Sequence, residues 1–440
     1  MKEYLTEIFR RKYLHWNRDD FLLHTGVMVL GTKLGDLFNF IYRIALVRLL
    51  TLDEYGSLNS LISFTMIISP FIVPFQPALT KSLAGYLGKD EFGKARYVTE
   101  KAGVTLGIFS ALVMAIFIFD AFFTGCLSNY LNINNRYYTV LIGLVVAGSI
   151  ITSVPWAFLQ GAQLFTSMAW IAAISAFIKL TLGLGLVYLG FKISGGLWGF
   201  ILYSLYILLV GTIYIKRYYK RRGIEKIRPV MVSMAPVYRY FIPTGLLLGS
   251  FFALTNMDVV LVRHFHPQES GIYSLAQMAG LIIFFLPGSV AMVIFPKVAA
   301  ARAVQADGLS LLKKSLVLVA GFCLLGVLAF SIFPAGLLHI ITGKINPQSI
   351  PLVPWFALAM SFHALTMLVI FYHLASHNTR IVLPMVLLAL AEAGTIYIYH
   401  PALKNILFIV LLYSIIAFIV SLIALKFVRS APLGLNYKTL

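Results

Sequence analysis

Long apolar runs alternate with short polar segments along the whole of this 440-residue chain. Each run is about 20 residues long, the length at which a helix crosses the roughly 30 Å hydrocarbon core of a bilayer. Apolar residues do not recur at every second position, so the strands of a membrane barrel are not indicated. The pattern predicts twelve membrane-spanning helices, at residues 22–50, 55–79, 102–123, 137–158, 167–190, 195–215, 240–262, 273–295, 316–338, 351–374, 381–399 and 405–426.

The composition explains why these runs need a membrane. Sixty per cent of the residues are hydrophobic and 12% are charged, whereas a soluble domain has about 25% charged residues. So large an apolar surface requires lipid as a second solvent, and lipid admits only helices and closed barrels. We therefore expect an all-α polytopic membrane protein.

The placement of the basic residues predicts how the chain is oriented. Of the 35 lysines and arginines, 26 fall in the termini and loops of one predicted side, and five fall in the loops of the other. Cytoplasmic loops carry the excess of lysine and arginine, so both termini are predicted to be cytoplasmic (N-in and C-in). The net charge of +19 is thus explained mostly by topology, and no nucleic-acid partner is expected.

A basic linker near residue 220 divides the chain into two predicted six-helix lobes, 1–222 and 223–440. The ends of spans 1 and 7 share three residues after a shift of 215 positions. These are Arg48, Glu54 and Gly56 in the first lobe, and Arg263, Glu269 and Gly271 in the second. Three matches could arise by chance, but a parallel six-plus-six repeat fits the topology and predicts a site between the lobes near the midplane.

Four polar residues lie on one face of span 1: Lys33, Asp36, Asn39 and Arg43, at spacings of 3, 3 and 4. Lys33 is roughly 17 Å from the inner end of the span, which is too deep for easy contact with water outside. The face either lines a water-filled cavity, where Lys33 and Arg43 would contact phosphate, or holds a Lys33–Asp36 pair that fixes helix packing. We favour the cavity, because one acid cannot neutralise two bases.

Lys179 lies in the middle of span 5, which contains no acidic residue, so it should face the cavity or a partner on another helix. Glu392 is the only acid of span 11. It is a candidate carrier of a coupling ion, or else the structural partner of a base elsewhere.

Charged residues also mark the predicted outer ends of spans 1 and 7. Asp258 and Arg263 in span 7 correspond, under the shift of 215, to Arg43 and Arg48 in span 1. We expect these residues to form a rim or gate, which an Arg43–Asp258 pair between the lobes could close in the inward-open state. Arg48 and Arg263 could instead simply anchor their helices at the membrane interface.

The segments 45–56 and 256–276 resemble the first-helix and seventh-helix signatures of a known transporter family. This is the polysaccharide-export, lipid-linked oligosaccharide flippase (Wzx-type) family of the multidrug/oligosaccharidyl-lipid/polysaccharide (MOP) exporter superfamily. The resemblance implies a V-shaped, MATE/MOP-like transporter of twelve helices that works by alternating access. The chain has no further helix pair after span 12, such as the lipid II flippases carry, so a peptidoglycan precursor is not the expected substrate.

The resemblance and the charges together predict a flippase in the bacterial cytoplasmic membrane. It would move polyprenyl-pyrophosphate-linked oligosaccharide, the repeat unit of O-antigen, capsule or exopolysaccharide, to the outer leaflet. The alternative is a cation-coupled multidrug exporter of the same superfamily, whose pocket should favour carboxylates. The core spans instead hold four bases (Lys33, Arg43, Arg48 and Lys179) against three acids (Asp36, Asp258 and Glu392), which suits an anion.

An enzyme is not expected, because the outer loops are short and contain no nucleophile or metal-ligand cluster, and no metal or cofactor is predicted. Besides membrane lipids and the lipid-linked substrate, a polysaccharide polymerase and glycosyltransferases are candidate partners.

Overall fold

The computed structural model describes residues 18–71, 75–284, 308–376 and 378–427. Throughout these ranges the regular structure is helical, with no strand. Seven helical stretches are long and apolar enough to cross a membrane. They span Phe92–Thr124, Tyr137–Gly161, Phe165–Arg221, Phe241–Phe265, Leu309–Ile332, Ile350–Ala375 and Leu403–Ala424. The predicted class, a multi-pass α-helical membrane protein, is confirmed, whereas the count of twelve crossings and the N-in/C-in orientation stay predictions.

The helices fall into a first half and a second half along the chain. The first half contains α2 (Arg18–Leu49), α3 (Leu52–Ile68), α4 (Phe75–Gly88), α5 (Phe92–Phe119), α6 (Cys126–Tyr130), α7 (Tyr137–Gly161), α8 (Phe165–Leu186) and α9 (Lys192–Arg221). The second half contains α10 (Ala235–Phe265), the helix Ser270–Phe284, α12 (Gly308–Ile332), α13 (Pro334–Thr342), α14 (Val353–Ala375), α15 (Val382–Ile398) and α16 (Leu403–Ala424). Each predicted span overlaps at least one of these helices, although residues 72–74 of the second span and 285–295 of the eighth lie outside the described residues.

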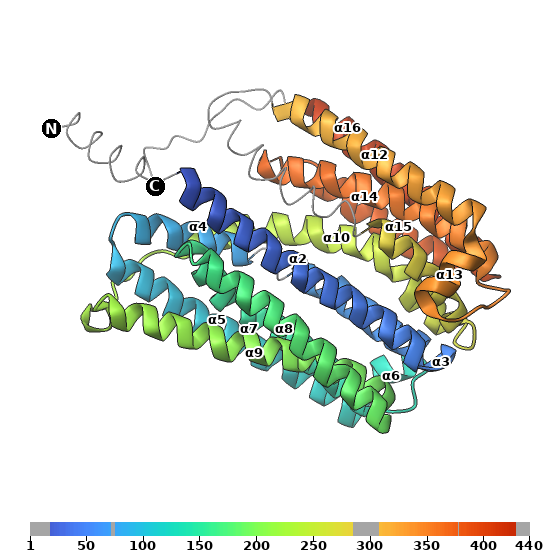
Figure 1. The fold of residues 1–440 in the computed structure, drawn as a ribbon, viewed down its shortest axis with the longest axis horizontal. Helices are drawn as coiled ribbons and strands as arrows, with labels where there is room; N and C mark the ends of the chain where they lie inside the picture. The colour runs from blue at the N-terminus through green and yellow to red at the C-terminus, as the bar shows by residue number, and fades with distance from the viewer. Residues whose placement is uncertain (1–17, 72–74, 285–307, 377, 428–440) are drawn as a thin grey trace.

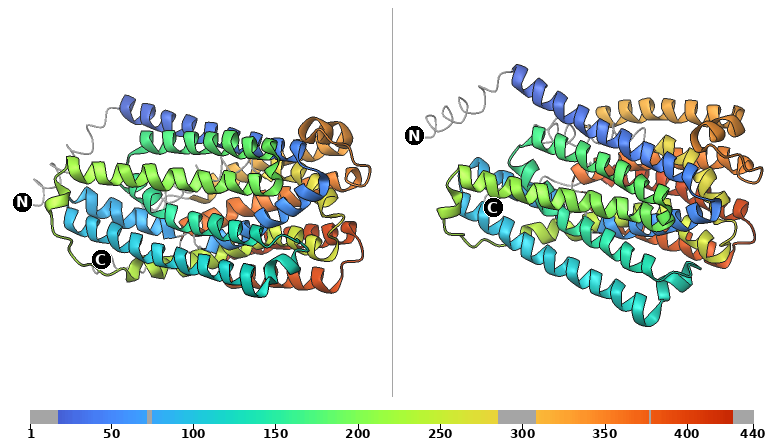
Figure 2. Two further views of the ribbon diagram at one scale, coloured as in Figure 1. Left: turned by 90° about the horizontal axis from the view of Figure 1, so that it is seen from below. Right: turned by 60° about the horizontal axis from the view of Figure 1, so that its bottom comes forward.

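The long helices run roughly along one direction in all three views (Figures 1 and 2). In Figure 1, α5, α7, α8 and α9 lie on one side of the molecule, and α12, α14 and α16 lie on the other. The short helices α6 and α13 lie together with the start of α3 at one end, which we call the α6–α13 end. The α4–α5 and α9–α10 connections lie at the opposite end.

A capping box starts α3 directly after α2 ends. The Thr51 side chain accepts a hydrogen bond from the Glu54 backbone N–H at 3.3 Å, and Glu54 Oε2 accepts one from the Thr51 N–H at 2.9 Å. Such reciprocal bonds satisfy two backbone donors that the first turn would otherwise leave unpaired. Glu54 also binds Lys192 at the start of α9 at 2.7 Å. The glutamate of the repeated segment therefore fixes the turn between α2 and α3.

The two halves meet closely where α3 crosses the helix Ser270–Phe284. A Cβ atom added to Gly56 would lie 2.5 Å from the backbone nitrogen of Gly271, so only glycine allows this approach. Farther along the same helices, Asn59 Nδ2 donates to Ser274 Oγ at 3.0 Å. Both pairs are 215 residues apart. Residues beside a two-fold axis contact their own counterparts in this way, so α3 and the helix Ser270–Phe284 are arranged pseudo-symmetrically.

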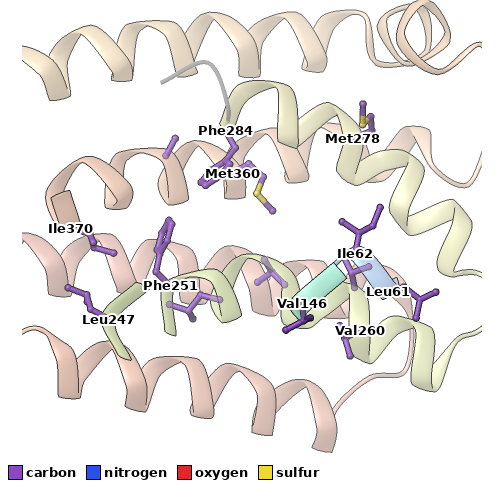
Figure 3. Packing of buried hydrophobic residues seen from close by; sticks show 14 of the residues in the cluster. Leu61, Ile62, Val146, Leu247, Phe251, Val260, Met278, Phe284, Met360 and Ile370 are labelled. Carbon is purple, nitrogen blue, oxygen red and sulfur yellow. The ribbon is translucent and has the colours of Figure 1, made fainter. Parts of the chain in front are cut away.

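Apolar side chains continue across this crossing, which we call the seam. Ile62 of α3 and Val146 of α7 belong to the same buried cluster as Phe251 and Val260 of α10 (Figure 3). Because one cluster serves both halves, separating them at the seam would expose apolar surface. Burial of apolar surface therefore helps to hold the halves together at the seam.

We expect that replacing either seam glycine with alanine destabilises the protein by about 1–3 kcal/mol, because the added methyl group has no room. The matched control is Gly321→Ala in α12, where an added Cβ meets nothing within 4 Å. That change should be neutral or stabilising by about 0.5–1 kcal/mol, since alanine favours the helix. Thermal unfolding of the purified variants measures the difference, and equal effects of Gly56→Ala and Gly321→Ala would refute the close packing.

Candidate functional site

A small cavity with a volume of about 40 Å³, which we call the chamber, lies beside the seam, between the two halves. Its polar lining residues are Arg43 on α2, Asn59 and Ser63 on α3, Thr255 and Asn256 on α10, and Gln277 on the helix Ser270–Phe284. Phe252, Phe284 and Met360 supply part of its apolar wall, and the last two are labelled in Figure 3. Among the described lining residues, Arg43 carries the only charge.

The polar face of α2 extends away from this chamber. Arg43 lies in the chamber wall, and Lys33 is ten residues, or about 15 Å, farther along the helix. Lys33 Nζ binds Asp36 Oδ2 at 2.9 Å, with side chains that are 44% and 62% exposed. The pair expected from its spacing therefore forms, but at an accessible position and not within the packing between helices. Asn39, between the pair and Arg43, is half-buried, and its Oδ1 has no hydrogen-bond partner among the described residues.

Lys179 on α8 has its partner on other helices, which is one of the two outcomes expected for it. The residue is 6% exposed, and its Nζ lies 4.2 Å from the ring centre of Phe200, 5.0 Å from Tyr42 and 5.6 Å from Tyr203. Ring faces attract a desolvated ammonium. Lys179 is not among the chamber-lining residues, but its charge is close enough to interact with that of Arg43. It adds positive potential behind the chamber wall.

Asp258 and Glu392 lie together inside the second half. Asp258 Oδ2 accepts a hydrogen bond from Tyr273 Oη at 2.8 Å. Glu392 on α15 is fully buried and interacts electrostatically with both residues. Within the described ranges, neither Glu392 oxygen has a hydrogen-bond partner. The expected Arg43–Asp258 pair is not among the ion pairs of the described residues, because Asp258 is bonded within its own half.

Arg263 crosses from the second half to the first at the α6–α13 end. Its Nε donates to the Leu131 carbonyl at 2.9 Å and its Nη2 to the Asn132 carbonyl at 3.1 Å, just beyond the end of α6. Its Nη1 binds Asp53 Oδ1 at 2.8 Å. The Arg263 side chain is only 5% exposed, whereas that of Asp53 is 70% exposed. The carbonyl bonds should therefore contribute more than the ion pair, which water screens.

Arg48 makes the corresponding contact in the opposite direction. Its Nε donates to the Ile341 carbonyl at 3.3 Å and its Nη2 to the Ile340 carbonyl at 2.5 Å, both in the last turn of α13. The carbonyl end of a helix carries partial negative charge, which favours a cation there. Each arginine thus binds the end of a short helix from the other half. We call these two contacts the arginine clasps.

Further contacts close the same end. Lys344 Nζ donates to the Leu50 carbonyl. His264 of the second half stacks on Tyr130 of the first with ring centres 4.1 Å apart, and its Nδ1 bonds the Tyr130 carbonyl at 2.7 Å. Arg48 and Arg263, for which the sequence left gate and anchor roles open, therefore both join the halves.

Several site residues were not identified from the sequence. Asn59, Ser63, Thr255 and Gln277 are single polar residues in apolar helices, a pattern that is common without any function. Asn59 and Ser274 are 215 positions apart, the same offset that relates spans 1 and 7. Applying this offset to polar residues as well would have identified the pair.

Comparisons with known proteins place this geometry in context. Residues 22–302 match the family model described as "Polysaccharide biosynthesis protein". A search of curated proteins finds no match. An inward-facing multidrug resistance MATE transporter of the MOP superfamily aligns with a TM-score of 0.66 and 12% identity, covering 92% of this chain and 98% of its own.

Two further solved structures have the same fold. A point mutant of the Vibrio cholerae MATE transporter VcmN aligns with a TM-score of 0.66 and 13% identity, over 93% of this chain and 96% of its own. The lipid II flippase MurJ, in an inward closed conformation, aligns with a TM-score of 0.63 and 15% identity, over 93% and 88% respectively.

We expect Arg263→Lys to lower stability by about 3 kcal/mol or more, because lysine cannot reproduce the branched bonds of the guanidinium and each hydrogen bond to a charged group contributes about 1.5–3 kcal/mol. Arg48→Lys, at the exposed clasp, should cost under about 1 kcal/mol. Thermal unfolding of the two variants and of Asp53→Asn measures the order of effects. A larger loss for Asp53→Asn than for Arg263→Lys would show that the ion pair, and not the carbonyl bonds, holds this end.

Proposed function

The chain belongs to the polysaccharide biosynthesis protein family of the MOP exporter superfamily, and on that premise we propose that it is a lipid-linked oligosaccharide flippase. It would move a polyprenyl-pyrophosphate-linked repeat unit of O-antigen, capsule or exopolysaccharide from the cytoplasmic to the outer leaflet. The observation that supports this most is the position of Arg43, the only charge among the described residues of the chamber wall, with Lys33 accessible on the same helix.

A pyrophosphate head group suits this arrangement. Arginine can bind phosphate oxygens through two parallel hydrogen bonds, and lysine binds them as a point charge. Lys33, at the accessible end of the polar face, would meet the head group first, and Arg43 would hold it in the chamber. Lys179 contributes through its charge, since rings enclose its ammonium. The polyprenyl chain would remain in lipid throughout.

The arginine clasps supply the gate in this proposal. They join the halves at the α6–α13 end, which is the outer end in the predicted orientation. Rocking of the predicted lobes 1–222 and 223–440 would break the clasps and expose the head group outside. An anion that moves outward is driven by an inside-negative membrane potential. Transport of the head group is therefore favoured even without a coupling ion.

The multidrug exporter alternative is less well supported by the chamber. A site for organic cations should offer carboxylates or aromatic faces. The described chamber lining contains an arginine and no carboxylate. Phe252 and Phe284 supply aromatic faces to this lining, but the charge of Arg43 would repel a cation bound there.

We also propose the bacterial cytoplasmic membrane as its location. Glycosyltransferases that build the lipid-linked unit would act before it, and a polymerase that consumes the unit would act after it.

Replacing both Lys33 and Arg43 with glutamine should abolish flipping, because the head group loses both cationic contacts, while the protein level stays unchanged. Lys89→Gln with Lys101→Gln removes two exposed charges, one in the α4–α5 connection and one on α5, and is the matched control, which should retain flipping. The measurement is transfer of a polyprenyl-pyrophosphate oligosaccharide across proteoliposomes, together with polysaccharide export in cells. Normal export by the Lys33/Arg43 double variant would overturn the proposal.

Glu392 is our candidate for a coupling ion, since it is a buried acid next to a second acid, Asp258. If it carries a proton or sodium ion, Glu392→Gln should make the flipping rate insensitive to an imposed gradient of that ion while transport driven by membrane potential persists. Flipping measured with and without each ionophore tests this. An unchanged gradient response in the variant would leave Glu392 a structural partner only.

A further inference from the structure

The chamber holds a group of uncharged polar side chains that phosphate binding does not use. Asn59 Nδ2 donates to Gln277 Oε1 at 2.9 Å and to Ser274 Oγ at 3.0 Å, and all three residues are buried. On the facing helix, Asn256 Nδ2 donates to Thr255 Oγ1 at 2.8 Å. Two amides from opposite halves are therefore linked across the seam, and a third lies beside them in the same wall.

One donor in this group lacks an acceptor. Gln277 is 1% exposed and lines the chamber, yet its Nε2 has no hydrogen-bond partner among the described residues. Asn59 already uses the Gln277 oxygen, so this amide is oriented with its nitrogen unsatisfied. Buried polar groups are nearly always paired, and an exception calls for a specific reason. An acceptor that arrives with a ligand is such a reason.

The chemistry of the wall indicates which part of a ligand would bind here. Amides offer both donors and acceptors, whereas a phosphate at neutral pH needs only donors. Hydroxyl and acetamido groups of a sugar can use both kinds of partner. Phe252 and Phe284 add flat apolar surfaces to the same wall, against which the C–H face of a sugar ring can pack. A few well-placed polar groups in an otherwise apolar wall are typical of a small-molecule site.

We propose that the chamber becomes a sugar subsite when the seam opens and enlarges it. Asn59, Asn256 and Gln277 then recognise the hydroxyl or acetamido groups of the sugar next to the pyrophosphate, while Arg43 holds the phosphate. This rests on the proposed flippase function and specifies how its head group is selected. The Asn59–Gln277 bond joins the two halves, and sugar hydroxyls can replace both its donor and its acceptor. Sugar binding therefore substitutes for a contact that must separate when the seam opens.

The test compares lipids that differ only in the sugar. Wild-type protein in nanodiscs is titrated with sugar-free polyprenyl pyrophosphate and with the same lipid carrying one glucose or one N-acetylglucosamine, and binding is followed by native mass spectrometry. We expect at least one sugar-bearing lipid to bind about tenfold more tightly than the sugar-free lipid, the effect of about one good hydrogen bond. Gln277→Leu should remove this preference and leave the affinity for the sugar-free lipid within about twofold.

Two further variants keep the outcome interpretable. Gln160→Leu, at a half-buried glutamine paired with Thr80 on α4, is the matched control and should keep the preference. Asn256→Ala removes a chamber amide whose bonds stay within α10, so it should weaken the preference without disturbing the seam. If Gln277→Leu fails to fold, the Asn256→Ala variant alone tests whether the chamber amides cause the preference for sugar-bearing lipid.

The results separate the two proposals. Equal binding of all three lipids by the wild type, or an unchanged preference in both chamber variants, would overturn the sugar subsite and leave the flippase proposal intact. Failure of the wild type to bind any polyprenyl pyrophosphate, including the sugar-free lipid, would instead count against the flippase proposal itself.

Discussion

A charged side chain inside a bilayer must find water or a partner, because lipid offers neither. This constraint accounts for the positions of the charges in the described helices. Lys179 is enclosed by three aromatic rings, Asp258 accepts a bond from Tyr273, and Arg263 binds the carbonyl end of α6. Arg43 lines the chamber. The helices therefore place one cationic side chain in the wall of the space between the halves.

Two kinds of contact join the halves, and they act at different places. The seam is close and mostly apolar, apart from the bonds of Asn59 to Ser274 and Gln277, and its crossing depends on Gly56 and Gly271 having no side chain. The α6–α13 end is polar, and its arginine clasps require the carbonyl ends of α6 and α13 to be in place. Apolar contacts tolerate sliding, whereas bidentate bonds are either made or broken. The polar end is therefore suited to being a discrete gate, whereas the seam can open gradually as the halves move.

Much of the fold could be predicted because lipid-spanning helices are recognisable by their length and apolar content. The short helices α6 and α13 could not be predicted, because helices of five and nine residues are too short to show such a length or apolar content. Without them, the carbonyl partners of Arg48 and Arg263 could not be identified. The Arg43–Asp258 pair was predicted from opposite charge and the shift of 215, and no sequence pattern indicated that Tyr273 would donate a hydrogen bond to Asp258. The rings around Lys179 were equally hard to predict, because they come from α2 and α9.

Positions 48 and 263 both carry arginine, whereas the equally related positions 43 and 258 carry arginine and aspartate. In a homodimer, one gene would impose the same side chain at both members of each pair. A single continuous chain removes that restriction, because each half can change alone. The two arginines have the same role in each half, because each binds the short helix of the other half. The unlike pair marks where the halves have diverged, one toward a cationic wall and the other toward a buried acid.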